Sequence, residues 1–466
     1  MAGSRLEASD DLAAAPSPTR DPAAEAAAHA TQLGQRELGE RVRRLRVAAG
    51  LSQTQLAAGR FSKEYVSQIE RGKTRPTADT LSWLAERLGA DAAFLASGVS
   101  SVDRYRWEAL LARGEALVEQ HDYEGAVREF EPAVEATRAL GAADLTVRAL
   151  AGQAWALQEL GRIQPAVDLL LEARVLAERP QFSDVERADV LFRLGVCRYK
   201  LSSISTAGAL LDEALMLADR SSLPCDRLRA QILLWRSRCY RRQRDYLAAR
   251  ENVERALELA ESLQHPRMAA SAYFQASLVA EREGHLGLAR SYAERARGCY
   301  EQIADHANVG RMLNNLGGLT HMLGKPAEAV GYLKDALHVL LDQGSDVEAA
   351  HVVCSLAEIH LETGRFVEAE SEARKALELL GDRVDYLSEI GTAQLALGRS
   401  LMEQDRLDEA QDILRAADRS FEQLASASHR ASAWIALGDL AHRRDDDRNA
   451  ARLYRRAAQA LQDVRF

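Results

Sequence analysis

The sequence has few of the features that mark secreted, membrane-spanning or disulfide-stabilised proteins. Only five cysteines occur among 466 residues; they are scattered, and no two form a CxxC pair. This spacing argues against a disulfide framework and favours reduced thiols in a cytoplasmic protein. Aromatic residues make up 6% of the chain. No apolar run approaches the roughly 18 residues that a transmembrane helix needs, so we expect no membrane span.

The N-terminal residues do not have the pattern of a secretory signal peptide. Residues 1–35 contain early acidic residues and no apolar core, which excludes a secretory signal peptide. They are rich in alanine, proline, aspartate and serine, without periodic apolar spacing. We therefore expect a flexible leader without an assigned function, with helix only between Ala23 and Gln35.

Motifs for catalysis and for cofactor or metal binding are also missing. The string RGKT at residues 71–74 resembles the end of a phosphate-binding loop, but Ser67 occupies the position of the required glycine. His351, Cys354 and His360 are metal-ligand residue types, but their spacing fits a helix face better than a metal site. There is no nucleophile elbow and no dinucleotide fingerprint. We expect no enzymatic activity, no cofactor and no metal.

Charge is unevenly distributed along the chain. The whole chain has a net charge of −9, yet residues 36–99 carry 11 basic and 7 acidic residues, a net charge of +4. The first 35 residues carry −3, and the residues after 99 carry −10. A basic segment on an acidic body favours attraction to phosphate at one end only.

From residue 104 to residue 466 the chain repeats itself about every 40 residues. Each unit has a small residue, an alanine twelve positions later, a residue four positions further that is bulky in seven of the nine units, and another small residue after three more. The first unit contains Gly114, Ala126, Phe130 and Ala133, and eight further units follow in register. Small residues predict close crossing of the two helices of a hairpin, and bulky residues would fill the space between hairpins. The sequence therefore predicts an α-solenoid of nine hairpins.

These repeats resemble tetratricopeptide (TPR) repeats over about three-quarters of the chain. Their period exceeds the usual 34 or so residues, so we expect longer helices. Turn signals separate the two helices of a hairpin, as in HDY (121–123), LGR (160–162), GKP (324–326) and TGR (363–365). We expect a polar linker at residues 98–103 and the solenoid, a sensor or interaction domain, at residues 104–466.

Residues 36–97 have the pattern of a compact domain of five helices. Leu38, Val42 and Leu45 fit the buried face of a first helix that ends near Gly50. Caps are predicted for the next four helices at Ser52 (with Gln55 as a capping box), Ser62, Thr77 and Asp91. Val66 and Ile69 would hold the third helix against the domain, with Gly72 ending it.

The segment 38–76 resembles the helix-turn-helix domain of the lambda-repressor-like (XRE) family. In that motif the N-terminal part of the recognition helix, here the third, enters the major groove. The resemblance implies DNA contacts by Gln53, Ser62, Lys63, Glu64, Tyr65, Ser67, Gln68, Lys73 and Arg75. Base edges would be met by Lys63, Glu64 and Ser67 or Gln68, whereas Lys73 and Arg75 would contact phosphates.

The same resemblance implies a buried salt bridge between Arg46 and Glu70 that stabilises the fold. One departure concerns the turn: four residues separate Ala57 from Ser62, where most relatives have five. A shorter turn would rotate the recognition helix slightly. The alternative is a helix-turn-helix fold kept for protein contacts.

The first helix of each hairpin lines the concave surface of a solenoid. Asparagine can pair with the backbone of an extended peptide, and arginine can hold a carboxylate or phosphate. The alternative is that Trp235 and Phe274 pack between repeats and that the arginines form a solvated face. The candidate effector-binding residues of the central repeats are Arg193, Tyr199, Gln231, Trp235, Arg238, Phe274, Gln275, Arg311, Asn314 and Asn315.

A helix-turn-helix domain followed by long-period TPRs resembles the peptide-pheromone-sensing regulators of the RRNPP class. The resemblance implies an all-α, cytoplasmic and nucleoid-associated transcriptional regulator. It would bind double-stranded DNA as a homodimer, because one small domain covers only a half-site. Its array would bind a peptide, a small molecule or a protein and thereby alter operator binding. The alternative is a TPR scaffold or adaptor that the helix-turn-helix domain anchors.

Overall fold

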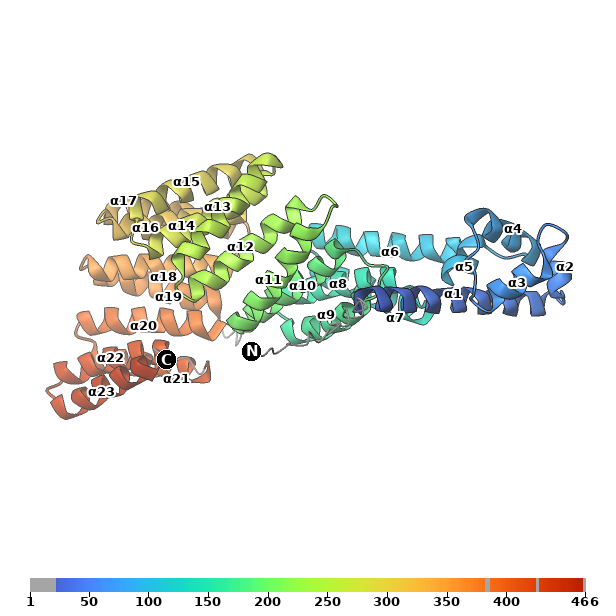
Figure 1. The fold of residues 1–466 in the computed structure, drawn as a ribbon. Helices are drawn as coiled ribbons and strands as arrows, with labels where there is room; N and C mark the ends of the chain where they lie inside the picture. The colour runs from blue at the N-terminus through green and yellow to red at the C-terminus, as the bar shows by residue number, and fades with distance from the viewer. Residues whose placement is uncertain (1–21, 382–385, 425–426, 464–466) are drawn as a thin grey trace, which may run out of the picture. The chain divides into compact units, whose positions relative to one another are not determined.

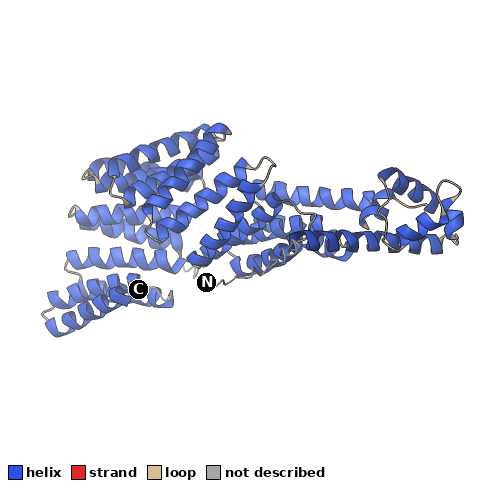
Figure 2. Cartoon of the chain, in the orientation of Figure 1, coloured by secondary structure: helices blue, strands red, loops and turns tan. Residues whose placement is uncertain are grey.

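The computed structural model describes residues 22–381, 386–424 and 427–463. These residues form 23 α-helices and no strand (Figure 2), which confirms the predicted all-α class. No described helix combines the length and the apolar character needed to cross a bilayer. The chain divides into two compact units, Met1–Pro224 and Cys225–Phe466, which are described separately below.

The first unit begins with the predicted five-helix domain (Figure 1). Its helices are α1 (Pro22–Ala48), α2 (Gln53–Ala57), α3 (Lys63–Glu70), α4 (Ala78–Leu88) and α5 (Ala92–Ser97). The first helix is longer than its apolar spacing predicts, because α1 is continuous from Pro22 into the domain. Residues 22–35 of the expected leader are therefore helical, and residues 1–21 lie outside the described residues.

Side-chain caps begin α2 to α5 at the four predicted residues. Each cap oxygen accepts a hydrogen bond from a backbone N–H two or three residues later, which satisfies a donor that the helix itself leaves free. The capping box is complete, since the Gln55 side chain also accepts from the Ser52 backbone. The caps are Ser52 on Gln55, Ser62 on Tyr65, Thr77 on Thr80 and Asp91 on Ala93.

Helix α3 is fixed against α1. A Cβ atom at Gly39 of α1 would collide with the carbonyl oxygens of Ile69 and Glu70, so only glycine allows this close crossing. The end of α3 is a Schellman motif, in which the Gly72 and Lys73 N–H groups donate to carbonyls of the last turn. Gly72 has a φ of +65°, the left-handed conformation that this motif requires. The predicted stop at Gly72 is confirmed.

The connection to the array is shorter and better packed than the predicted linker. Helix α6 begins at Ser101, which leaves only residues 98–100 between α5 and α6. The Asp91 carboxylate accepts hydrogen bonds from both the backbone N–H and the hydroxyl of Ser101. Val99 is 1% exposed and belongs to the core of the first hairpins. Arg41 of α1 donates to the Leu95 carbonyl at the end of α5.

Helices α6 to α23 form nine consecutive hairpins, the number that the repeats predict (Figure 1). Most of these helices have 17 residues, which accounts for the long period. The first unit contains α6 (Ser101–Glu119), α7 (Tyr123–Leu140), α8 (Ala143–Glu159), α9 (Ile163–Ala177), α10 (Asp184–Lys200) and α11 (Ile204–Arg220). The predicted turns HDY and LGR lie between the helices of its first two hairpins.

The second unit contains the other six hairpins, again with the predicted turns GKP and TGR between paired helices. Its helices are α12 (Asp226–Arg242), α13 (Tyr246–Ser262), α14 (Pro266–Arg282), α15 (Leu286–Gln302), α16 (His306–Met322), α17 (Pro326–Asp342), α18 (Asp346–Glu362), α19 (Phe366–Leu380), α20 (Leu387–Glu403), α21 (Leu407–Gln423), α22 (Ala427–Arg443) and α23 (Asp447–Asp463).

The small and bulky residues of the repeat pattern contact each other mainly within one hairpin. The bulky residue of the second helix packs over the small residue of the first, so that a Cβ atom at Gly317 would lie 2.7 Å from Leu333. The pairs Gly195 with Leu211 and Gly398 with Leu414 repeat this contact. We expected the bulky residues to fill the space between hairpins. Phe130 makes both kinds of contact, because it covers Gly114 of its own hairpin and Gly152 of the next.

Candidate nucleic-acid interface

Helix α3 presents a polar face that begins at its N-terminus. Lys63, Glu64 and Gln68 are exposed, while Val66 and Ile69 are buried in the domain core. Apolar residues thus hold one side of the helix and leave long polar side chains on the other. This is the arrangement that readout of base edges in a major groove requires.

Some of the predicted contact residues also stabilise the domain. The Ser62 hydroxyl oxygen caps α3, so its own proton remains to be donated. Tyr65 is half-buried, with its ring centroid 5.4 Å from that of Phe61, and Ser67 is half-buried. The Gln68 amide oxygen accepts from the Thr74 hydroxyl at 3.2 Å, which leaves the amide nitrogen as a donor. These four side chains are less free to reach DNA than Lys63 and Glu64.

The predicted salt bridge between Arg46 and Glu70 is present and buried. Two guanidinium nitrogens of Arg46 contact the two carboxylate oxygens, at 2.6 and 3.1 Å, and the Glu70 side chain is only 4% exposed. The hydrogen bond to Glu70 raises the pKa of Arg46 above its usual value. Arg46 also donates to the Leu51 carbonyl, so it joins α1 to the start of α2. These contacts confirm a structural role.

Gln53 belongs to the same network. Its amide nitrogen donates to Glu70 at 2.8 Å, so the side chain is held in place at the first turn of α2. An amide nitrogen carries two hydrogens, and the second can donate to a phosphate. Gln53 is therefore positioned by the fold for the contact that the resemblance implies.

Lys73 and Arg75 follow α3 and are exposed. Among the described residues neither has an ion-pair partner, in contrast to Arg46. Both lie in the loop after the Schellman motif, which fixes the direction of the chain as it leaves α3. Unpaired cations in this position suit phosphate contacts.

The turn between α2 and α3 is compressed. Ala58 has a φ of 42° and Gly59 a φ of 77°, so two consecutive residues adopt the left-handed conformation. Left-handed backbone is costly for alanine and free for glycine. The left-handed conformation of these two residues reverses the chain within the four residues that lie between Ala57 and Ser62.

An aromatic and cationic cluster beside this turn was not predicted from the sequence. The Arg60 guanidinium carbon lies 5.7 Å from the ring centroids of both Phe61 and Trp83. The two rings meet edge to face, with centroids 5.1 Å apart. Arg87 lies 5.9 Å from the Trp83 ring and donates to the Gln55 carbonyl. The only sequence signal for this cluster is an Arg-Phe pair directly before the Ser62 cap.

The predicted effector-binding residues lie on first helices of hairpins, as expected, but in both units. Arg193 and Tyr199 belong to α10 of the first unit, and the other eight lie on α12, α14 and α16 of the second. Arg193 forms an ion pair with Asp189 at 2.7 Å and lies over the Trp155 ring. Tyr199 is half-buried.

In the second unit, several of these side chains have structural partners. Trp235 is half-buried beneath the Arg238 guanidinium, 4.2 Å from its ring centroid. Phe274 packs against the hydrophobic core, which favours the alternative role foreseen for it. Arg311 pairs with Glu348 of the next hairpin at 2.6 Å, and Gln231 is half-buried.

Three of the predicted effector-binding residues on α14 and α16 have amide side chains, and two of these have a buried amide oxygen without a partner among the described residues. Gln275 is 3% exposed, and its amide oxygen has no hydrogen-bond partner within the described part of the chain. The amide oxygen of Asn314 is likewise buried and unpaired there. The amide oxygen of the neighbouring Asn315 accepts from the Ser277 hydroxyl. A buried acceptor without a donor is unfavourable, so these oxygens favour a bound donor, either water or a ligand N–H.

The three residues of metal-ligand type, His351, Cys354 and His360, have different surroundings. His351 is exposed and lies 3.5 Å from Glu389, whereas His360 is buried. Burial raises the pKa of Cys354 to about 12, so this thiol stays protonated near neutral pH. Within the described residues no three His, Cys, Asp or Glu side chains are grouped as metal ligands would be.

Comparison with protein families identifies both parts of the chain. A helix-turn-helix domain model matches residues 37–97. Two tetratricopeptide-repeat models match residues 230–263 and 309–340. The chain therefore contains a helix-turn-helix domain and, within its array of hairpins, tetratricopeptide repeats. A comparison with curated proteins finds no match.

Solved structures show the same fold at low sequence identity. The apo form of the quorum sensor NprR from B. thuringiensis is 14% identical, covers 76% of this chain and 98% of its own, and has a TM-score of 0.57. A Rap protein complexed with Competence and Sporulation Factor is 15% identical, covers 77% and 98%, and has a TM-score of 0.52. A signal-transduction ATPase with a tetratricopeptide repeat sensor from Pyrococcus horikoshii is 14% identical, covers 80% and 55%, and has a TM-score of 0.59.

Proposed function

We propose that this protein is a transcriptional regulator that binds double-stranded DNA in a sequence-specific way and acts on the nucleoid in the cytoplasm. The observation that carries the proposal is the exposed polar face of α3, on a domain of charge +4 joined to an acidic array. Lys63, Glu64 and Gln68 read base edges, and Lys73 and Arg75 contact phosphates. A homodimer reads two half-sites.

Arg60 adds a phosphate contact to this set. It lies two residues before the Ser62 cap, a distance of up to about 7 Å along an extended chain. The major groove is roughly 8.5 Å deep. When the N-terminus of α3 lies in the groove, a residue about 7 Å back along the chain lies near the edge of the groove, where the phosphates are. Arg60 is at that position. The rings of Phe61 and Trp83 hold its guanidinium group in place before DNA binds.

The tetratricopeptide array binds an effector that changes operator binding. The unpaired amide oxygens of Gln275 and Asn314 support this, because they match the N–H groups of an extended peptide. Two structures with the same fold point the same way: NprR is a quorum sensor, and the Rap protein holds Competence and Sporulation Factor. A small-molecule effector or a protein partner would use the same surface.

A scaffold or adaptor, anchored by the helix-turn-helix domain, is the second candidate. It is favoured by the packing of Phe274 into the core and by the pairing of Arg311 with Glu348, which leave fewer free groups on the sensor surface. The two candidates differ in whether the full-length protein prefers particular DNA sequences.

The test is the binding of full-length protein to its own promoter fragment, compared with random DNA, over a range of salt concentrations. We expect Lys63→Ala combined with Gln68→Ala to abolish the sequence preference, since each good base contact contributes about 1–3 kcal/mol of discrimination. Arg60→Ala should weaken binding to both DNAs and lower the salt slope by about one. Arg44→Ala, on the exposed face of α1, is the matched control and should change neither.

The wild-type protein decides between the two candidates. If it shows no preference for the promoter fragment, the regulator proposal fails and the adaptor remains. Mass spectrometry of molecules that co-purify with the full-length protein would identify the effector. Trp235→Ala and Asn315→Ala should then preserve folding but remove the influence of that effector on DNA binding.

A further inference from the structure

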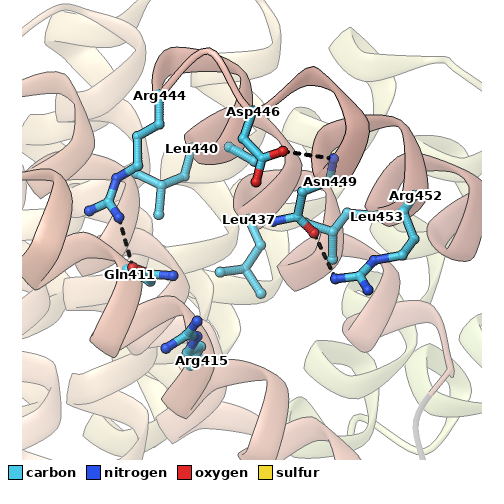
Figure 3. A pocket seen from close by; sticks show the side chains of 10 residues that line it. Gln411, Arg415, Leu437, Leu440, Arg444, Asp446, Asn449, Arg452 and Leu453 are labelled. Carbon is cyan, nitrogen blue, oxygen red and sulfur yellow. Dashed lines mark hydrogen bonds between the residues drawn. The ribbon is translucent and has the colours of Figure 1, made fainter.

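A cavity of about 210 Å³ opens between the second helices of the last two hairpins (Figure 3). Its lining residues come from α21, α22, the turn after α22, and α23. Leu437 and Leu440 of α22 and Leu453 of α23 form its apolar part. The proposed effector surface uses first helices of earlier hairpins, so this cavity is a separate feature.

The polar part of the cavity is cationic. Three arginines line it from three different elements: Arg415 from α21, Arg444 from the turn after α22, and Arg452 from α23. Asp446 is the one acidic residue in the described lining. Its carboxylate accepts a hydrogen bond from the backbone N–H of Asn449 in the first turn of α23, and its charge offsets only one of the three arginines.

Two of the arginines are held in place by the protein. Arg444 donates to the amide oxygen of Gln411 at 2.9 Å and to Asp408 at 2.6 Å. Arg452 donates to the amide oxygen of Asn449 at 2.7 Å. A guanidinium group has five N–H donors, so both keep donors for a ligand and lose little freedom when one binds.

Arg415 is not neutralised in this way. Within the described residues it has no hydrogen-bond acceptor or ion-pair partner, and in Figure 3 its guanidinium group lies on the same side of the cavity as Gln411. A cationic group without a counter-charge, in the same cavity lining as two oriented guanidinium groups, gives the lining an excess of positive charge. Anions are attracted there, and a carboxylate can accept two parallel N–H bonds from one arginine.

We propose that this cavity binds a small organic anion, a carboxylate on a short apolar chain. The arginines supply donors for the carboxylate, and the leucines cover the chain and remove it from water. Inorganic phosphate would satisfy the arginines but would leave the leucines in contact with water. A neutral alcohol of the same length would fill the apolar part but leave Arg415 without a counter-ion. The cavity therefore selects for both parts of the ligand together.

The test is isothermal titration of the full-length protein with hexanoate, acetate, hexan-1-ol and inorganic phosphate. We expect hexanoate to bind at least tenfold more tightly than the other three. Arg415→Ala should weaken hexanoate binding at least tenfold, because it removes the unpaired cation. Arg419→Ala, an exposed arginine further along α21, is the matched control and should leave the affinity unchanged.

The proposal would be overturned if the Arg415→Ala variant bound hexanoate as tightly as the wild-type protein does. It would also be overturned if the wild-type protein bound acetate, hexan-1-ol or phosphate as tightly as hexanoate. Failure to detect hexanoate binding at all would do the same. Circular dichroism of each variant checks folding, and Arg415→Ala should fold normally because Arg415 has no partner within the described residues. None of these measurements depends on DNA binding, so they can fail while the proposed regulator function stands.

Discussion

The helix-turn-helix domain and the repeat array are both built from helices, but different contacts hold them together. In the domain, α2 to α5 each begin with a side-chain cap, and one buried ion pair joins α1 to the end of α3. In the array, several second helices, among them α9, α15, α17 and α21, begin without a side-chain cap. There the same glycine contact recurs in five of the nine hairpins. The domain therefore depends on a few particular residues, whereas the array distributes its stability over many equivalent ones.

Ion pairs illustrate the same difference. Exposed pairs connect successive hairpins of the second unit, such as Arg290 with Glu328 and Arg311 with Glu348. Each exposed pair contributes roughly 0–1 kcal/mol, so losing one changes little. The pair of Arg46 and Glu70 is buried, and removing one partner would leave a charge without compensation.

The largest effect is expected for Glu70→Ala. It leaves the half-buried Arg46 guanidinium without a counter-charge and removes the acceptor of Gln53, which should cost about 3–5 kcal/mol of domain stability. Hydrogen exchange of the full-length protein should show loss of protection in α1 to α5 and unchanged protection in α14 to α21. Glu86→Ala, an exposed carboxylate on α4, is the control and should have an effect below about 0.5 kcal/mol. A uniform loss of protection along the whole chain would contradict the view that the domain depends on its own particular contacts.

An intermediate effect is expected from a pair of adjacent glycines in α16. A Cβ atom at Gly317 would lie 2.7 Å from Leu333, whereas one at Gly318 would meet no atom within 4 Å. Gly317→Ala should therefore destabilise the second unit by about 1–3 kcal/mol through overpacking. Gly318→Ala should stabilise it by up to about 1 kcal/mol, because alanine favours helix.

Urea unfolding of the two variants measures this contrast. Equal effects of the two substitutions would show that helix propensity, and not the helix crossing, determines the choice of glycine at these positions. Opposite signs would show that the recurrent small residue is required by the bulky residue of the second helix.

The features that sequence analysis predicted well are local or periodic. A cap and the N–H that it binds are two or three residues apart, so Ser52, Ser62, Thr77 and Asp91 could be identified directly. The hairpins were identified because the same residue types recur about every 40 residues. The pair of Arg46 and Glu70 was predicted only through a family resemblance, because its partners are 24 residues apart.

The features that were missed depend on contacts between distant segments. The position of Arg60 is set by Trp83 of α4, and no local pattern connects these two residues. The linker was predicted as polar, and nothing local in it shows that Val99 is buried in the first hairpins. Among the predicted effector-binding residues, a fixed helical position did not distinguish Phe274, which packs against the core, from Asn314, whose amide oxygen is buried without a partner among the described residues.

The smallest effect is expected for an exposed ion pair that joins the two helices of one hairpin. Arg220 of α11 donates two hydrogen bonds of 3.0 Å to Asp184 at the start of α10, and these bonds lower the pKa of Asp184. Folding then favours the ionised carboxylate, so the stabilisation is complete above the unfolded-state pKa of about 3.9 and is lost as the pH falls through the lower folded-state value. Because the Arg220 side chain is 63% exposed, Asp184→Asn should cost less than a third of the effect of Gly317→Ala at pH 7.

A double-mutant cycle of Asp184→Asn and Arg220→Ala isolates this pair from the effect of Asp184 on the start of the helix. Urea unfolding at pH 7, 5 and 3.5 should give a small favourable coupling at the two higher values and a weaker one at pH 3.5, where the carboxylate begins to be protonated. A coupling that is independent of pH would mean that the side chains interact by packing and not by charge. A coupling as large as the loss expected for Glu70→Ala would remove the distinction between the domain and the array, because a single exposed pair would then matter as much as the buried one.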